Sequence, residues 1–201
     1  STHCISSAAS DVYKRQVLVN MVRSHGIEDL AFLFLLNAIC VAIPGLSNGI
    51  FCVLNGILYG PAWGFIVNWI SDILGQIILM ELLQKLYDMK KMSNSKVYKL
   101  LTGLKSPMLG LIIGYMIPFI PSATVSYVNI MINKEQRKKQ LIPIIIGVIP
   151  FAYLYAYGGD SILHLDGTRL IKVVISFVVI ALIAVAILLS LRAIKKRTKK
   201  A

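Results

Sequence analysis

Four long stretches without a charged residue limit what this chain can fold into. No Asp, Glu, Lys or Arg occurs over residues 30–71, 106–133, 141–159 or 173–191. Of the 201 residues, 57% are hydrophobic and 15% are charged, whereas a soluble domain is about half apolar and about a quarter charged. A membrane-spanning helix needs about 20 apolar residues. The chain is therefore predicted to be an all-α integral membrane protein.

The two ends of the chain are expected to lie outside the membrane unit. Residues 6–16 (SSAASDVYKRQ) resemble a translated sequencing adapter. We therefore treat residues 1–16 as a scar that is not part of the fold, and expect the native N-terminus to be missing. Residues 17–192 form the expected single membrane domain, and residues 193–201 form an expected basic cytoplasmic tail.

The apolar segments are of two kinds. Four of them fit spanning helices, the first one short: residues 29–43, 61–83, 141–157 and 170–191. Residues 44–60 and 107–133 are also apolar, but Pro and Gly interrupt them and make a continuous helix unfavourable. These two segments are expected to contain broken helices.

Basic residues set the expected orientation. Most of them fall in four places: Arg23, residues 85–105, residues 134–139 and residues 192–200. Because Lys and Arg concentrate on the cytoplasmic side, both termini are expected there, and residues 44–60 and 107–133 must each enter and leave the membrane on one face. The prediction is about four transmembrane helices plus two opposed re-entrant helical hairpins, as in inverted-repeat transporters. A single kinked span over residues 107–133 is the alternative.

Small and polar residues recur at four-residue spacing in one predicted span. This spacing places them on one helix face: Gly60, Gly64, Asn68, Asp72 and Gln76. A carboxylate near mid-span, such as that of Asp72, costs about 3 kcal/mol to insert unless it is solvated, paired or protonated. We expect Asp72 to exchange protons or to contact a headgroup in a polar cavity. The alternative is that it accepts hydrogen bonds from hairpin backbone NH groups and holds the bundle together.

Polar residues of the two interrupted segments are expected to line the same cavity. They are Ser47, Asn48, Asn55, Ser122, Thr124, Ser126 and Asn129. Capping of broken helix ends is the alternative role for Ser47 and Ser122. Closer to the cytoplasmic end, Glu81 is expected to be a surface carboxylate that is either solvated or paired with Lys85, one helical turn further on.

Short motifs follow one another in a defined order. They are IPG at 43–45, GILYGP at 56–61, Gly64, Gly75, PFIP at 118–121, GVIP at 147–150 and YGGD at 157–160. This order resembles the DedA superfamily, also called the SNARE-associated Golgi protein or VTT-domain family, and in particular its Golgi-Tvp-like bacterial branch. The resemblance covers about residues 28–162 and implies two opposed re-entrant hairpins. It assigns a structural hairpin motif to Pro44, Gly45, Gly56, Gly60, Gly64, Gly75, Pro118, Pro121, Gly147, Pro150 and Asp160.

The same resemblance implies lipid movement in a bacterial plasma (inner) membrane. Family members scramble or flip phospholipids or recycle lipid carriers, and some depend on the proton gradient. They often carry an Arg three residues before the first Pro of the PFIP motif, where this chain has Tyr115. Since neither hairpin contains Lys or Arg, tight binding of a polyprenyl-phosphate carrier is not favoured. The residues expected along the substrate or proton pathway are Asp72, Asn68, Gln76, Asn55, Asn48, Ser126, Asn129 and Tyr115.

Two other functions remain open: a proton-coupled transporter of small solutes, and a non-transport membrane assembly factor. An enzyme is not expected, because His25 and His164 lie outside the apolar runs and no embedded pair of acids occurs. No metal or cofactor is expected. The expected partners are protons and membrane lipids, with anionic headgroups at the basic loops and tail. Nucleic acid is not an expected partner, and a homo-oligomer is compatible with the sequence.

Overall fold

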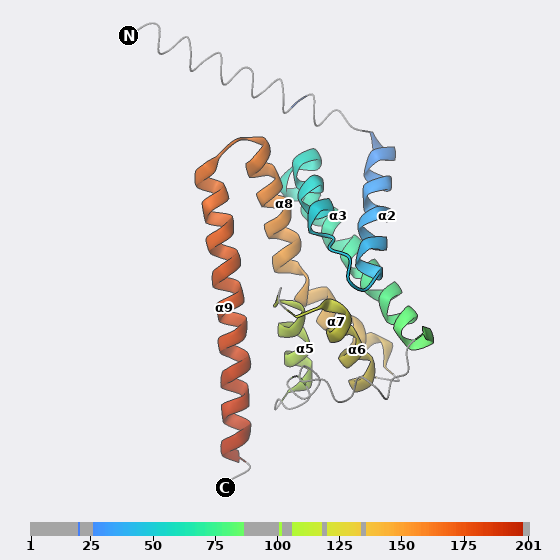
Figure 1. Ribbon diagram of the computed structural model, residues 1–201, viewed down its shortest axis with the longest axis vertical. Helices are drawn as coiled ribbons and strands as arrows, with labels where there is room; N and C mark the ends of the chain where they lie inside the picture. Colours follow the sequence, from blue (N-terminus) through green and yellow to red (C-terminus); the bar gives the residue numbers. More distant parts are fainter. Residues whose placement is uncertain are drawn as a thin grey trace, which may run out of the picture.

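The computed structural model describes residues 20, 26–86, 101, 106–117, 120–133 and 136–198. All regular elements in these residues are helices, which confirms the predicted all-α class (Figure 1). They are α2 (Ile27–Ala42), α3 (Gly49–Leu86), α5 (Pro107–Tyr115), α6 (Ser122–Ile132), α7 (Arg137–Gly147), α8 (Ile149–Leu163) and α9 (Gly167–Thr198). Residues 1–16 lie outside the described part, and α9 continues past residue 192 through much of the basic segment.

Three helical segments are long and apolar enough to cross a membrane: Gly49–Lys85, Arg137–Leu163 and Gly167–Ser190. They support the prediction of an integral membrane protein. The fourth expected span, over residues 29–43, corresponds to α2, which has 16 residues. A span needs about 20 residues, so the described chain contains three candidate spans where four were expected.

Helix α3 folds back on itself at Gly60. This residue has φ 77° and ψ −178°, a backbone conformation that residues with a side chain rarely adopt. A Cβ placed on Gly64 would lie 2.9 Å from the Cα of Gly56, so the residues before and after Gly60 run antiparallel in close contact. We call residues 49–59 the short arm of α3 and residues 61–86 its long arm.

Helix α2 runs beside the long arm of α3 and in the same direction. Asn37 of α2 contacts Ser71, and Val41, one turn later, contacts Gly75. The short arm is antiparallel to the long arm, so it is antiparallel to α2 as well. Helix α2 and the short arm therefore form the first hairpin, and its turn (residues 43–48) lies beside the middle of the long arm.

This arrangement corrects the expected boundaries of the first hairpin. Residues 44–60 were expected to enter and leave the membrane alone, after a span over residues 29–43. In the structure, residues 44–60 supply only the turn and the returning limb. The other limb is α2, because its contacts with the long arm keep it parallel to that arm.

Helices α5 and α6 form the second hairpin, from the opposite end of the molecule (Figure 1). The hydroxyl oxygens of Tyr115, at the end of α5, and Ser126, in the first turns of α6, lie 2.8 Å apart. Pro118, in the intervening turn, lies outside the described residues. Helices α7 and α8 then return along the molecule to the turn that leads into α9, which runs along the outside of the bundle.

The start of α2 and the α8–α9 turn lie at one end of the molecule, and the end of α9 lies at the other (Figure 1). Gly26 and Thr198 are therefore at opposite ends. The expectation that both chain termini share one side depends on residues before Gly26, nearly all of which lie outside the described part.

The main apolar core lies around the second hairpin. Its buried members include side chains from the end of the long arm and from α5, α6 and α7: Leu79, Leu83, Leu111, Val125, Val128, Ile130 and Ile144. Around the first hairpin, by contrast, the fully buried side chains include the amides of Asn37, Asn55 and Asn68. Burying a polar group costs free energy unless it is hydrogen-bonded, so these amides need hydrogen-bond partners inside the bundle.

Candidate functional site

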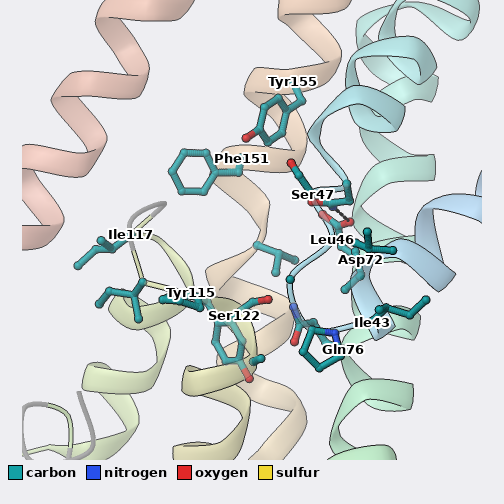
Figure 2. Close-up of a pocket in the computed structure, with 18 residues that line it drawn as sticks. Ile43, Leu46, Ser47, Asp72, Gln76, Tyr115, Ile117, Ser122, Phe151 and Tyr155 are labelled. Carbon is teal, nitrogen blue, oxygen red and sulfur yellow. Dashed lines mark hydrogen bonds between the residues drawn. The ribbon is translucent and has the colours of Figure 1, made fainter. Parts of the chain in front are cut away.

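A pocket of about 340 Å³ lies where the turns of the two hairpins meet (Figure 2). Residues 43–48 of the first turn and residues 120–123 of the second form much of its wall, together with Phe151 and Tyr155 of α8. The turn residues at its rim are largely exposed, whereas its floor is buried. The pocket therefore runs from an open rim between the two turns to a polar floor.

The floor of the pocket is formed by Asp72 and Gln76 of the long arm and Tyr115 of α5. All three are less than 9% exposed. They were predicted pathway residues, and the structure brings them together with a fourth, Asn48, in one cavity. Four-residue spacing on the long arm places Asp72 and Gln76 on the face that the two turns approach.

Asp72 is held by side-chain amides. Asn48, from the first turn, donates its Nδ2–H to Oδ1 of Asp72 at 2.7 Å, and Asn37 donates to the same oxygen at 3.3 Å. Within the described part of the chain, the donors to Asp72 are thus side-chain amides and not the backbone NH groups considered from the sequence. Among the described residues that line this pocket there is no Lys or Arg, so the carboxyl faces neutral hydrogen-bond donors only.

Sequence reasoning missed Asn37. It is fully buried, and its Nδ2 also donates to the hydroxyl of Ser71, while its Oδ1 accepts a weak hydrogen bond from the Cys52 thiol at 3.6 Å. An amide in the otherwise apolar sequence of residues 30–36 and 38–43 was the available signal, because a polar side chain inside a predicted helix of this kind needs a partner.

Gln76 connects the long arm to the second hairpin. The Ser126 hydroxyl donates to Oε1 of Gln76 at 2.7 Å, and the Tyr115 hydroxyl lies 2.8 Å from the Ser126 oxygen. Ser126 does not line the pocket itself but hydrogen-bonds to two residues that do. The polar contacts of the two hairpins thus meet one helical turn below Asp72.

Three other predicted pathway residues lie outside the pocket. Asn55 donates to Oδ1 of Asn68 at 2.8 Å, and Asn68 donates to the carbonyl oxygens of Cys52 and Ala152 at 3.0 and 3.3 Å. These bonds tie the short arm to the long arm and to α8. Asn129 donates to the carbonyl oxygen of Gln140 at 2.8 Å and so ties α6 to α7.

The glycines of the motif sit at backbone contacts. A Cβ on Gly56 would collide with the backbone of Ala156 in α8, and one on Gly75 would lie 2.6 Å from the carbonyl oxygen of Ala38. Gly45 has φ +96° in the first turn, where a side chain would be strained. The motif therefore specifies close approach between helices and a tight turn.

The remaining motif residues shape helix ends. Pro44 lies in the first turn and lines the pocket, Pro121 caps α6, and Pro150 stands in the first turn of α8, where its missing NH has no cost. Asp160 is buried near the α8–α9 turn, with its carboxylate 3.4 Å from Nδ1 of His164 and 3.9 Å from Arg169. Asp160 does not line the pocket.

The two hairpins repeat one packing contact. In the first half, Gly75 lies against Ala38 and Val41, which precede Pro44 by six and three residues. In the second half, Gly147 lies against Ile112 and Tyr115, which precede Pro118 by six and three residues. In both halves the first of these residues contributes its carbonyl oxygen and the second its Cβ. This correspondence is the pattern expected of an internal repeat.

The ion pair predicted within the long arm is different from the one that forms. Glu81 pairs with Arg137 at the start of α7, at 2.7 Å, and not with Lys85. The residues around the pocket also offer no metal site: in the described part of the chain, no three His, Cys, Asp or Glu side chains converge.

The turn sequence GLSNG at residues 45–49 fits the GxSxG pattern of hydrolase nucleophiles. In that pattern the serine follows a strand and has a histidine as general base. Here Ser47 follows a helix, and no His is among the described residues that line the pocket. Among the described residues, Ser47 thus has neither the preceding strand nor the lining His that this pattern needs, and we assign it no catalytic role.

The family model that matches this chain is that of the VTT domain, over residues 43–161. The match covers the first turn, the long arm of α3, the second hairpin and α8. The chain belongs to the VTT-domain family. This is the domain of the DedA and SNARE-associated Golgi proteins, so the resemblance drawn from the motifs is confirmed. The finer assignment to a Golgi-Tvp-like bacterial branch stays a prediction.

Searches of curated proteins and of solved structures return no significant match. The assignment of the VTT domain therefore depends on the family match. Together with the three apolar helices, the match identifies an integral membrane protein whose polar pocket lies between two broken helical elements.

Proposed function

We propose that this VTT-domain protein moves lipid between the two leaflets of its membrane, with the headgroup in the polar pocket and the acyl chains outside that pocket. The observation that carries the proposal is a pocket with a buried polar floor between the turns of two hairpins. Irregular backbone at membrane depth is tolerated only where it is buried in protein or lines a wet cavity.

The depth of Asp72 supports this placement. It follows Gly60 by 12 residues, which corresponds to about 18 Å along a helix. The hydrocarbon core is about 30 Å thick. With Gly60 at one membrane surface, Asp72 and the turn beside it lie near the middle of the bilayer, and α2 with the short arm is a re-entrant hairpin. The second hairpin enters from the opposite, basic end.

The orientation follows from the same arrangement. Exposed Arg137, Lys138 and Lys139 begin α7 at the end of the molecule where α9 also ends. With that end on the cytoplasmic side, α2 begins at the outer face and three segments cross the membrane. We place the protein in the bacterial plasma membrane, where anionic lipid would attract this basic end.

The chemistry of the lining favours transit over tight binding. Asn48, Gln76 and Tyr115 offer neutral amides and a hydroxyl, and Asp72 offers the carboxyl. A phosphate is held strongly by Arg or Lys, and neither lines the pocket in the described part of the chain. A polyprenyl-phosphate carrier is therefore a poorer substrate than a bulk phospholipid. Asp72 is the acidic residue of the pocket through which coupling to protons would occur.

The test is a lipid-movement assay. The purified chain is reconstituted into liposomes of phosphatidylcholine and phosphatidylglycerol that contain a fluorescent phospholipid, and an impermeant quencher is added outside. Wild-type protein should let the inner-leaflet probe be quenched, and Asp72→Asn should slow this about tenfold, which corresponds to about 1.4 kcal/mol. Asp166→Asn is the matched control, because Asp166 pairs with Arg169 at the α8–α9 turn, away from the pocket.

Liposomes with wild-type protein that are quenched no faster than empty liposomes would reject lipid movement. Repeating the assay with and without a pH gradient tests proton coupling. Uptake of a small solute that collapses with the gradient, without any lipid movement, would instead favour the proton-coupled solute transporter.

A further inference from the structure

A second cavity, of about 430 Å³, adjoins the polar pocket. It lies between the short arm of α3 and α8, and its lining is mostly hydrocarbon: Ser47, Gly49, Ile50, Val53, Leu54 and Tyr155. We call it the apolar groove. Ile50 is 69% exposed, so the groove is open to the surroundings of the helix bundle, which in this segment are the lipid tails.

The apolar groove and the polar pocket share two residues, Ser47 and Tyr155. The Tyr155 ring stands against the start of the short arm, since a Cβ on Gly49 would lie 3.5 Å from ring atoms Cε1 and Cζ. From the other side the ring faces Phe151 and Phe177, with centroids 6.3 and 6.4 Å away. Figure 2 shows Tyr155 at the end of the pocket away from Gln76. One aromatic ring therefore stands where the polar and the apolar spaces meet.

We propose that the apolar groove holds one acyl chain of the phospholipid whose headgroup occupies the polar pocket, with Ser47 and Tyr155 at the junction of the two. This inference rests on the proposed function and adds a binding site for the apolar part of the substrate. A phospholipid joins a polar group to an apolar chain covalently, and here a pocket with a polar floor adjoins a groove lined mostly by hydrocarbon.

The physical role of the groove is to orient the lipid. Lipid tails are as apolar as the side chains around them, so no hydrophobic gain drives a chain from bilayer to groove. The groove instead supplies van der Waals contacts that hold the acyl chain in a defined position. A chain lying along Val53 and Leu54 would keep the headgroup at Ser47, from which Asn48 and Asp72 are the next polar groups.

Two photoreactive phospholipids test the site on the full chain in the liposomes described above. One carries a diazirine in the acyl chain and the other carries it in the headgroup. With wild-type protein, the acyl probe should label residues 49–54 and Tyr155, and the headgroup probe should label the polar pocket. Val53→Trp fills the groove and should reduce acyl labelling of this segment about tenfold, which corresponds to about 1.4 kcal/mol in the free energy of binding the chain. Headgroup labelling of the pocket should be retained.

The matched control is Val178→Trp on α9, which is 49% exposed and lines neither cavity. It should leave both labelling patterns unchanged. If Val53→Trp does not fold, Ile50→Trp replaces it, because a side chain that is 69% exposed can be enlarged without disturbing the core. Acyl labelling of residues 49–54 that persists in the groove variants, or that is equally strong over α9, overturns the proposal.

Lipid movement separates failure of the groove from failure of the proposed function. Val53→Trp should slow movement about tenfold, and Val178→Trp should not. If Asp72→Asn stops movement while the groove variants label and move lipid normally, the groove proposal falls and lipid movement through the pocket stands. If wild-type protein moves no lipid, the proposed function falls, and the acyl-labelling contrast alone decides whether the groove binds a chain.

Discussion

The two halves of the molecule share a packing contact but bury different chemistry beneath it. Gly75 packs against the residues three and six positions before Pro44, and Gly147 packs against the residues three and six positions before Pro118. Asn37 lies seven positions before the proline in the first half, and Leu111 has the same position in the second. Asp72 lies three positions before the glycine in the first half, and Ile144 has the same position in the second. The first pair is hydrogen-bonded, whereas the second pair is fully buried in the apolar core.

This difference separates what the fold needs from what the site needs. Leu111 and Ile144 show that the packing unit closes with hydrocarbon at these two positions. The amide and the carboxyl of the first half are therefore not required by the backbone contact itself. Even for buried ion pairs, replacement by a well-packed apolar pair of similar volume is often neutral or stabilising. The acid in the first half is best explained by the pocket that it faces.

The largest expected effect comes from imposing the chemistry of the first half on the second. Ile144→Asp buries a carboxyl without a partner and should lower stability by about 3 kcal/mol or more. Adding Leu111→Asn supplies an amide at the position that Asn37 occupies in the first half, and should recover about 1 kcal/mol. Thermal unfolding in detergent, followed by the loss of the monodisperse species, measures both. Equal stability of Ile144→Asp and wild type would contradict the apolar burial of this position, on which the comparison of the two halves depends.

The shared contact should respond equally in both halves. Gly75→Ala places a methyl group 2.6 Å from the Ala38 carbonyl oxygen, and Gly147→Ala places one 2.5 Å from the Cβ of Tyr115. Overpacking of this kind costs about 1–3 kcal/mol. Gly167→Ala is the control, since nothing lies within 4 Å of its added Cβ. A large loss in one half with no loss in the other would break the comparison.

The reverse exchange should affect transport more than stability. Asn37→Leu combined with Asp72→Ile gives the first half the apolar pair of the second. The protein should fold with stability within about 1 kcal/mol of wild type or better, because Asn48 borders the pocket and can be hydrated there. Movement of the fluorescent phospholipid should fall about tenfold. Wild-type movement in this folded variant would show that the acid is not part of the lipid path.

Much of this arrangement could be predicted from the sequence, because uncharged runs, interrupted helices and four-residue spacing are local properties. They gave the all-α class, the long arm and the positions of Asp72 and Gln76 at the pocket. The direction of α2 could not be predicted in this way. It depends on contacts of Asn37 and Val41 with the long arm. The positions of the basic residues, from which a separate span was predicted, contain no information about such contacts.

The roles of the asparagines also needed the structure. Asn55, Asn68 and Asn129 were predicted as pathway residues. An asparagine that joins two helices and one that lines a cavity cannot be told apart from the sequence. Their hydrogen bonds to another amide or to backbone carbonyl oxygens show that they join helices. Asn48 differs only in lying at the turn, where its amide reaches Asp72.

The smallest expected effect concerns the links between the halves. The buried link runs from Gln76 through Ser126 to Tyr115, with distances of 2.7 and 2.8 Å, and the surface link joins Glu81 to Arg137, whose side chain is 78% exposed. Ser126→Ala should cost about 1 kcal/mol in unfolding free energy, because Gln76 loses a donor in a buried site. Arg137→Gln should cost less, within the range of about 0–1 kcal/mol for exposed pairs, and its effect should vanish at high salt. A double-mutant cycle with Tyr115→Phe measures whether the hydroxyls act as one unit. If the surface pair proves the stronger link, the two halves are held together mainly outside the pocket, and separating their turns would cost little free energy at the Ser126 contact.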